Sequence, residues 1–224
     1  MAEAYTNQSQ STFDEEGNDL GWGKDSIAIM LKHFPGDGAG EGGRESHTFE
    51  GKFAVFPGNN MDEHIQVFTE GGLDLSGETG KTSAFMTSYA ITTDGEGNPL
   101  FGDEFVGSAY NPELINILRV DHEYDGVLVT DWGVTNDNAN EVGYDFSYMG
   151  PSYGMEDKTV EERHFYALVA GIDMFGGNND KAPVLAAYEM WQEAHENGEL
   201  EQSAEERFRT SAKRIVRNFF NVGI

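Results

Sequence analysis

Four short apolar runs constrain the fold of this chain most strongly. They occupy residues 27–34, 84–89, 126–131 and 171–175. Glycine, proline or aspartate bounds most of them, and polar residues do not alternate regularly within them. Such runs are typical of strands that are buried on both faces, as in a parallel sheet.

Capping signals show where helices begin between and after these runs. Asn111, followed by proline, is a good N-cap, and Thr159 and Ser203 each have a glutamate three residues later, which is the capping-box pattern. Together with apolar periodicity, these signals predict helices over residues 60–70, 111–122, 159–171, 181–196 and 203–221. Strands that alternate with helices predict βαβ units, a parallel sheet and therefore an α/β fold.

Two long segments interrupt this alternation. Residues 35–59 and 92–109 are rich in glycine and acidic residues, and both follow strand ends. Loops of this length are usually functional or disordered. Because ligands of α/β folds bind at the carboxyl ends of the strands, we expect the functional site beside these loops.

Composition excludes several classes of protein. The 224 residues include no cysteine and carry a formal net charge of -26. Without cysteine there is no disulfide scaffold and no thiolate metal site. A carboxylate-rich surface opposes nucleic-acid binding, and no apolar run approaches the ~20 residues of a membrane helix. Residues 1–26 show no targeting signal, and the compartment stays undetermined.

Three motif matches fail on their context. Gly38, Gly40 and Gly43 have dinucleotide-loop spacing, but no helical pattern follows them. Residues 77–83 resemble a phosphate loop, but the first glycine is misplaced and a strand follows. Residues 195–199 lack the second histidine of a zinc helix. We therefore predict neither a metal nor a cofactor.

Asp131 is the sharpest chemical feature. It ends a predicted buried strand and is followed by Trp132 and glycine. A carboxylate there would lie at the mouth of a sheet or barrel, and the indole offers a face on which a sugar ring could stack. The alternative is that Asp131 only caps the next turn, and the pattern alone leaves both interpretations open.

Lys32 and His33 end another predicted strand, directly before a Pro-Gly turn. Two adjacent donors at a strand end can bind hydroxyls or phosphates. The alternative is a lysine in solvent beside a histidine that is hydrogen-bonded in the core.

Five segments that follow one another along the chain resemble the N-terminal barrel domain of glycoside hydrolase family 3, the β-glucosidase-type enzymes, and the resemblance extends from about residue 21 to residue 223. They are GWGKDSIAIMLKHFPGDG, GKFAVFPGNN, MTSY, YDGVLVTDWGVT and TVEERHFYALVAGIDMFGGNN. The resemblance implies that Asp131 is the nucleophile of a retaining glycosidase. It assigns substrate contacts to Lys32, His33, Tyr89, Trp132 and Met155.

The chain also departs from the family pattern. Only about four βα units can be traced, whereas a complete barrel has eight. We therefore expect a polar segment over residues 1–20 and, over residues 21–224, about the C-terminal half of a TIM-type (β/α)8 barrel with long strand-end loops. The family's general acid/base usually comes from a following domain. The missing barrel half and that domain are thus expected partners.

The resulting hypothesis is a retaining, exo-acting hydrolase that acts in carbohydrate metabolism. It would cleave terminal β-D-glucosyl residues from oligosaccharides or β-glucosides through a glycosyl-enzyme on Asp131. As a fragment without its acid, the chain is expected to have little or no activity alone. A non-catalytic sugar-binding remnant is the main alternative, and an α/β phosphate binder is a third.

Overall fold

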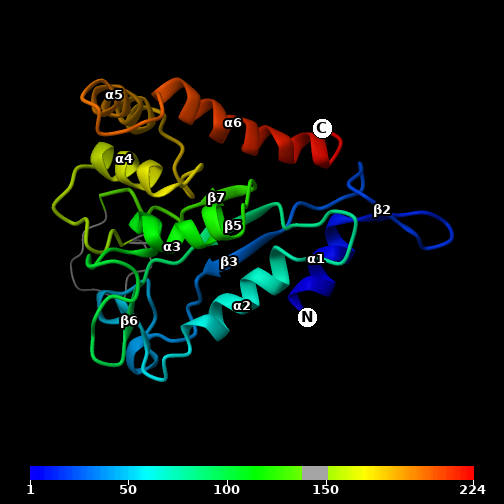
Figure 1. Ribbon diagram of the computed structural model, residues 1–224, viewed down its shortest axis with the longest axis horizontal. Helices are drawn as coiled ribbons and strands as arrows, with labels where there is room; N and C mark the ends of the chain where they lie inside the picture. The colour runs from blue at the N-terminus through cyan, green and yellow to red at the C-terminus, as the bar shows by residue number, and fades with distance from the viewer. Residues whose placement is uncertain (138–150) are drawn as a thin grey trace.

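A parallel sheet forms the centre of the computed structural model, which describes residues 1–137 and 151–224 (Figure 1). Strands β3 (Met30–Phe34), β5 (Ala84–Thr87) and β7 (Val127–Val129) pair in the order β3-β5-β7. Val129 also bridges in parallel to Met174, in the fourth apolar run. All four predicted strand segments therefore lie side by side, which confirms the α/β class. Their membership in one half of an eight-stranded barrel stays a prediction.

Five helices follow the predicted positions closely. They are α2 (Met61–Gly72), α3 (Pro112–Asn116), α4 (Val160–Ala170), α5 (Ala182–Glu196) and α6 (Ala204–Asn221). The Asn111 side chain caps α3, and the capping boxes at Thr159 and Ser203 are both formed. The expected helix over 111–122 differs in detail, because after α3 the chain continues as a π-helical turn, Ile117–Asp121.

The polar N-terminal segment is part of the fold. It forms helix α1 (Ala2–Gln10), which packs against α2, and the antiparallel pair β1 (Thr12–Phe13) and β2 (Asp19–Gly21). Gln10 is fully buried. Its amide oxygen accepts hydrogen bonds from the backbone N–H groups of Ser83 and Ile29, and its amide nitrogen donates to the Lys81 carbonyl. This glutamine joins α1 to the start of the sheet.

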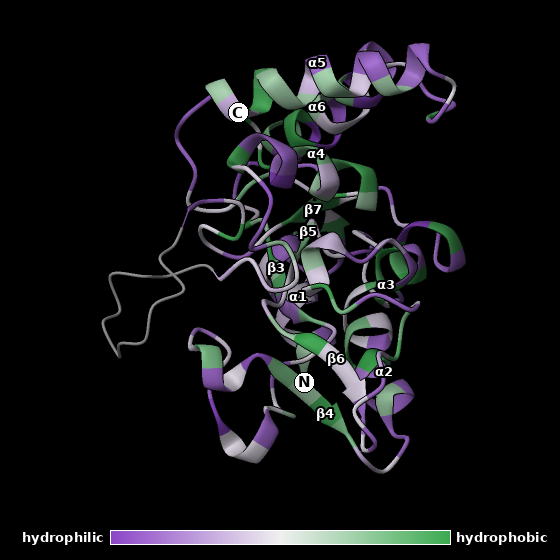
Figure 2. Ribbon diagram, turned by 90° about the vertical axis from the view of Figure 1, so that its left-hand side faces the viewer, coloured by the Kyte–Doolittle hydropathy of each residue, from purple (hydrophilic) through white to green (hydrophobic). Residues whose placement is uncertain are grey.

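The two long segments after strand ends contain structure that the sequence did not predict. Strands β4 (Phe53–Phe56) and β6 (Ile91–Asp94) form a separate two-stranded parallel sheet. Short 3-10 turns cover Glu41–Gly43, Phe49–Gly51 and Ser108–Tyr110. Ala54 and Phe56 are buried with Met61 in a small apolar cluster, and β4 is largely hydrophobic in Figure 2. Burial of alternate β4 residues therefore stabilises what would otherwise be a loop.

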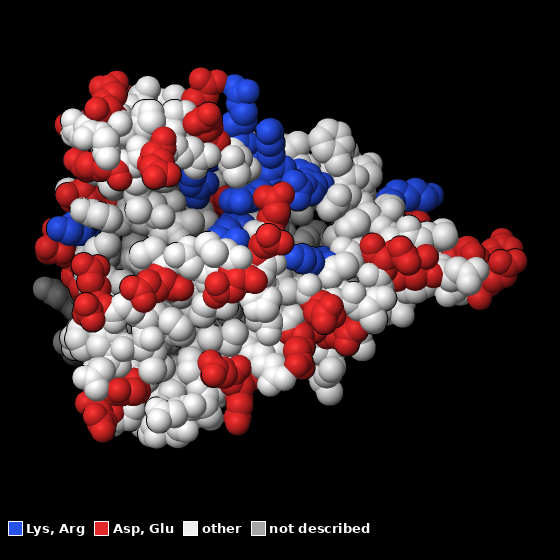
Figure 3. Space-filling model, viewed as in Figure 1, with Lys and Arg blue, Asp and Glu red and all other residues white. Residues whose placement is uncertain are grey.

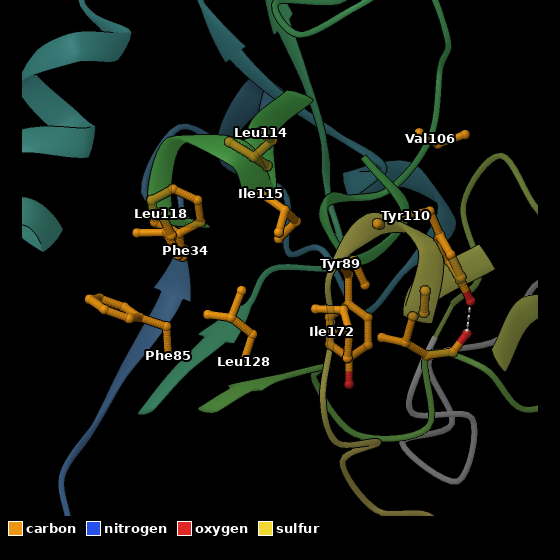
Figure 4. Close-up of a cluster of buried hydrophobic side chains, with 14 of the residues drawn as sticks. Phe34, Phe85, Tyr89, Val106, Tyr110, Leu114, Ile115, Leu118, Leu128 and Ile172 are labelled. Atoms are coloured by element: carbon orange, nitrogen blue, oxygen red, sulfur yellow. Dashed lines mark hydrogen bonds between the residues drawn. The ribbon is translucent and has the colours of Figure 1, made fainter. Parts of the chain in front are cut away.

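The main hydrophobic core lies between the central sheet and α3. Phe85 and Leu128, from neighbouring strands, are fully buried, and Figure 4 shows them with Leu114 and Ile115 of α3. The Phe85 ring contacts Tyr124 edge-on, with centroids 5.0 Å apart. Because this core holds the strands in register, it also fixes where their carboxyl ends lie.

An ionic cluster attaches α6 to the sheet. Asp173, in the fourth strand segment, is almost completely buried and forms ion pairs with Arg119, Arg207 and Arg214. Its carboxylate also accepts a hydrogen bond of 2.6 Å from Ser211 Oγ. Lys and Arg side chains gather beside α6, whereas acidic side chains are spread over the rest of the visible face (Figure 3). The cluster is thus a local concentration of positive charge in an acidic chain.

No helix in residues 1–137 and 151–224 has both the length and the apolar character needed to cross a membrane.

Candidate active site

Asp131 lies just beyond the carboxyl end of β7, and only 2% of it is exposed. Its Oδ1 accepts a hydrogen bond of 2.7 Å from the backbone N–H of Trp132. Its Oδ2 is buried and has no hydrogen-bond partner among the described residues. His33 Nε2 lies 3.2 Å from Oδ2, but the two atoms are not aligned for a hydrogen bond. Oδ1 of Asp131 is therefore held in place by a hydrogen bond, whereas Oδ2 accepts none from the described residues.

His33 lies between two carboxylates. While Nε2 faces Asp131, Nδ1 lies 2.9 Å from Oδ2 of Asp37, in the turn that follows β3. The hydroxyl of Ser88 donates a short hydrogen bond to the other oxygen of Asp37. The carboxyl ends of β3, β5 and β7 thus bring their polar residues to one place.

Tyr89 lies beside Asp131 at the carboxyl end of the sheet. It is almost fully buried, and its hydroxyl donates a hydrogen bond of 2.7 Å to the Trp132 carbonyl. Burial, and next the negative charge of Asp131, raise the pKa of Tyr89 well above its ordinary value of 10.0. The phenol is therefore neutral across the physiological pH range and remains a donor beside the carboxylate.

Two other predicted site residues, Lys32 and Met155, make no hydrogen bond with Asp131 in the part of the chain that the structure describes. Lys32 is exposed on β3, and no hydrogen bond or ion pair of its amino group occurs within the described residues. Met155 is buried and lines a cavity of about 520 Å³ with residues such as Tyr110 and Tyr166. Neither Asp131 nor Trp132 lines that cavity. The structure thus brings together Asp131, His33, Tyr89 and Trp132, and it places Met155 beside a different hollow.

A glycine pair holds the Trp132 indole in place. Gly176 donates its N–H to the Thr130 hydroxyl and accepts from the N–H of Gly133. Gly177 has φ +67°, and a Cβ there would lie 2.8 Å from Cε3 of Trp132. The indole of Trp132, a residue that is 48% exposed, therefore packs directly on the backbone of Gly177.

Gly177→Ala is expected to displace this indole. The substitution should cost about 1–2 kcal/mol of stability through its left-handed backbone and shift tryptophan fluorescence. Gly97→Ala is the matched control, because Gly97 has φ +88° with nothing within 4 Å of an added Cβ. It should cost similar stability and leave the tryptophan fluorescence unchanged. Equal fluorescence shifts in the two variants would contradict the close packing of the indole on Gly177.

Sequence reasoning missed a second pair of residues near Tyr89. The His47 and Tyr89 rings meet edge-on, with centroids 4.7 Å apart, and His47 Nδ1 lies 2.6 Å from a Glu45 carboxylate oxygen. Nε2 of His47 makes no hydrogen bond within the part of the chain that the structure describes. The available signal was that His47 is the only histidine in the long segment 35–59.

Within residues 1–137 and 151–224, no group of three or more His, Cys, Asp or Glu side chains is arranged to hold a metal ion.

Comparisons with known proteins agree with this architecture. Residues 1–218 match the family model of the glycosyl hydrolase family 3 N-terminal domain. A periplasmic β-glucosidase/β-xylosidase of Dickeya chrysanthemi is 32% identical over 208 residues, which are 89% of this chain and 29% of that protein. A probable β-glucosidase C of Aspergillus oryzae is 30% identical over 205 residues, 90% of this chain and 28% of that protein. The chain thus spans less than a third of these relatives.

Solved structures show the same fold. A β-glucosidase from Listeria innocua in complex with isofagomine superimposes with a TM-score of 0.59 at 18% identity, covering 99% of this chain and 25% of that one. A family 3 β-N-acetylglucosaminidase from Paenibacillus superimposes with a TM-score of 0.57 at 22% identity, covering 88% and 31%. At these identities the likeness concerns the fold alone.

Proposed function

The chain belongs to glycoside hydrolase family 3, whose N-terminal domain its residues 1–218 match, and from this membership we propose that it carries the nucleophile of a retaining, exo-acting β-glucosidase-like hydrolase. The observation that carries the proposal is the buried Oδ2 of Asp131, which has no hydrogen-bond partner among the described residues. A carboxylate whose other oxygen is fixed by a backbone N–H is oriented for attack.

In the proposed reaction, Oδ2 attacks the anomeric carbon of a terminal β-D-glucosyl residue. The bond to the leaving oxygen breaks, its electron pair moves to that oxygen, and a glycosyl-enzyme ester forms. Water then attacks the same carbon, loses a proton to a base and releases Asp131. The sugar would lie against Trp132, with Lys32, His33 and Tyr89 contacting its hydroxyls. Family relatives named as β-glucosidases support a β-glucoside or oligosaccharide as substrate.

The leaving oxygen needs a proton donor unless it is a weak base. Among the described residues near Asp131, we propose His47 for partial assistance, because Glu45 holds its Nδ1, its other nitrogen makes no hydrogen bond within the described residues, and its ring contacts Tyr89. A following domain remains the proposed source of the main acid. The chain alone should then hydrolyse activated glucosides better than ordinary ones.

His47→Ala tests this assignment. It is expected to lower hydrolysis of aryl β-glucosides with basic leaving groups by up to about 100-fold, and to leave dinitrophenyl β-glucoside hydrolysis within about twofold, since that leaving group needs no proton. The comparison requires rates for a series of aryl glucosides. His122→Ala, which removes an exposed histidine, should change neither rate. An equal loss on both substrates would assign His47 to binding or folding.

A 2-deoxy-2-fluoro-β-glucoside with an activated leaving group tests the function itself. It should trap the ester on Asp131, and mass spectrometry of a peptic digest should find the label on that residue. Glucose binding without any label would support the alternative, a non-catalytic sugar-binding remnant. That alternative draws on the same polar residues around Trp132 and on the length of the relatives, of which this chain spans about 29%.

A further inference from the structure

Asp37 occupies a position that the proposed reaction does not use. It lies in the turn after β3, and its Oδ2 is 2.9 Å from Nδ1 of His33. The opposite ring nitrogen, Nε2, is 3.2 Å from Oδ2 of Asp131. A single imidazole therefore connects a partly exposed carboxylate with the buried one.

Ser88 fixes the orientation of Asp37. Its hydroxyl accepts from the N–H of Ala90 at 3.1 Å and donates to Oδ1 of Asp37. Its own N–H donates to the Phe34 carbonyl at 2.7 Å, which ties the end of β5 to the end of β3. With Oδ1 occupied by this donor, Oδ2 is the oxygen left for His33.

We propose that Asp37 is a positioning residue for the nucleophile: it keeps a proton on Nδ1 of His33 and thereby holds the ring with Nε2 facing Asp131. The proposal rests on the function proposed for Asp131. An acceptor on one imidazole nitrogen determines which nitrogen carries the proton in the neutral ring. Asp131 is the other acceptor near the ring, but its Oδ2 lies farther away, 3.2 Å from Nε2, and is out of line for a hydrogen bond, so the contact with Asp37 decides the tautomer.

The surrounding charges are consistent with this role. Asp37 faces the ring from its own turn, Asp131 from β7, and the neutral phenol of Tyr89 lies at the end of β5. Beyond Tyr89 are Glu45 and His47, which pair with each other. The neighbouring Lys32 is exposed on β3. Asp37 is thus the carboxylate that contacts Nδ1 of His33.

Asp37→Asn is the most informative variant, because it should reverse the tautomer and keep the shape. The Ser88 hydroxyl would still donate to the amide oxygen, so the amide NH2 group would face Nδ1. A donor at that position requires Nδ1 to accept, and the proton of the neutral ring moves to Nε2. Imidazole ¹⁵N spectra at pH 7.5, with the His33 signals assigned through His33→Gln, report this directly.

We expect a protonated Nδ1 in the unmodified chain and an unprotonated Nδ1 in Asp37→Asn. Labelling of Asp131 by the fluoroglucoside should slow at least about tenfold, since fixing the wrong tautomer is costly in comparable sites. Asp74→Asn removes the same charge from an exposed residue and should change neither readout. Ser88→Ala should loosen Asp37 and slow labelling less.

The outcomes separate the two proposals. An unprotonated Nδ1 in the unmodified chain, or ¹⁵N spectra of His33 that Asp37→Asn does not change, would overturn the positioning role. If Asp37→Asn reverses the tautomer of His33 but leaves the rate of Asp131 labelling unchanged, then the position of His33 does not matter to the nucleophile, and this part of the proposal is wrong. Reversal in a chain that never labels would sink the proposed function and still support the placement of His33 by Asp37.

Discussion

Asp131→Asn is expected to lower hydrolysis of dinitrophenyl β-glucoside at least about a thousandfold, as removal of a nucleophile typically does. The amide is neutral and attacks poorly, although its oxygen can still accept the hydrogen bond that Trp132 donates to Oδ1. The folded structure should therefore persist. Circular dichroism and thermal unfolding of the variant should match those of the unmodified chain, while covalent labelling is lost.

Asp131→Ala provides a sharper form of this test. It leaves a small space where the carboxylate was, and azide supplied in solution can attack the anomeric carbon from the same side. Attack from that side of a β-glucoside gives the α-glucosyl azide, whereas the unmodified chain gives β-glucose through two inversions. Asp157→Asn, at a largely exposed carboxylate, should behave like the unmodified chain. Full turnover in Asp131→Asn would reassign the nucleophile.

Asp173→Asn is expected to destabilise the fold by about 3–5 kcal/mol, because it leaves buried arginines without their counter-charge. Arg119, Arg207 and Arg214 all pair with this carboxylate. Burial lowers the pKa of Arg119 to about 10 even with Asp173 beside it, so its charge is already costly. Urea unfolding at pH 7 measures the loss of free energy.

Asp125→Asn is the matched control for this prediction. Asp125 also pairs with Arg214, and with Arg217, but its side chain is 56% exposed. Exposed ion pairs contribute about 1 kcal/mol or less, so this variant should lose far less stability. Equal losses would mean that burial of the Asp173 cluster does not determine its contribution.

The same cluster predicts how stability depends on pH. Burial tends to raise the pKa of Asp173, but Arg119, Arg214 and Arg207 outweigh it and hold the pKa below its ordinary value of 3.8. A carboxyl group with a lowered folded-state pKa stabilises the fold fully above its unfolded pKa, and that stabilisation disappears as the pH falls through the folded-state value. The stability difference between the unmodified chain and Asp173→Asn should therefore be constant above about pH 5 and shrink below 3.8.

The sequence predicted the elements that local signals specify. Three of the apolar runs became β3, β5 and β7, the fourth joined them at Met174, and the caps at Asn111, Thr159 and Ser203 formed. These features depend on neighbouring residues or on burial along one strand. The meeting of Asp131 with His33 followed from the rule that parallel strands end at one edge.

What the sequence did not predict depends on distant partners. Gln10 has a polar side chain, yet it is buried, because the backbone N–H of Ser83 and the backbone carbonyl of Lys81 form hydrogen bonds with its amide group. Strand β4 forms its backbone hydrogen bonds with β6. Phe53 pairs with Ile91, which lies 38 residues further along the chain. The pair of Glu45 with His47 is local, but its place beside Tyr89 is not. No pattern within a short window contains these contacts.

The burial of Gln10 also bears on the order in which the chain folds as it is synthesised. The backbone N–H of Ser83 that this side chain binds lies 73 residues later in the chain. Helix α1 leaves the ribosome before α2 and β5, and with nine residues it is too short to be stable alone in water. It must wait until α2 and the start of β5 have emerged. During that interval the α1 segment is exposed to proteases and chaperones, and the exposure ends once residue 83 has emerged from the ribosome and Gln10 can bind its backbone.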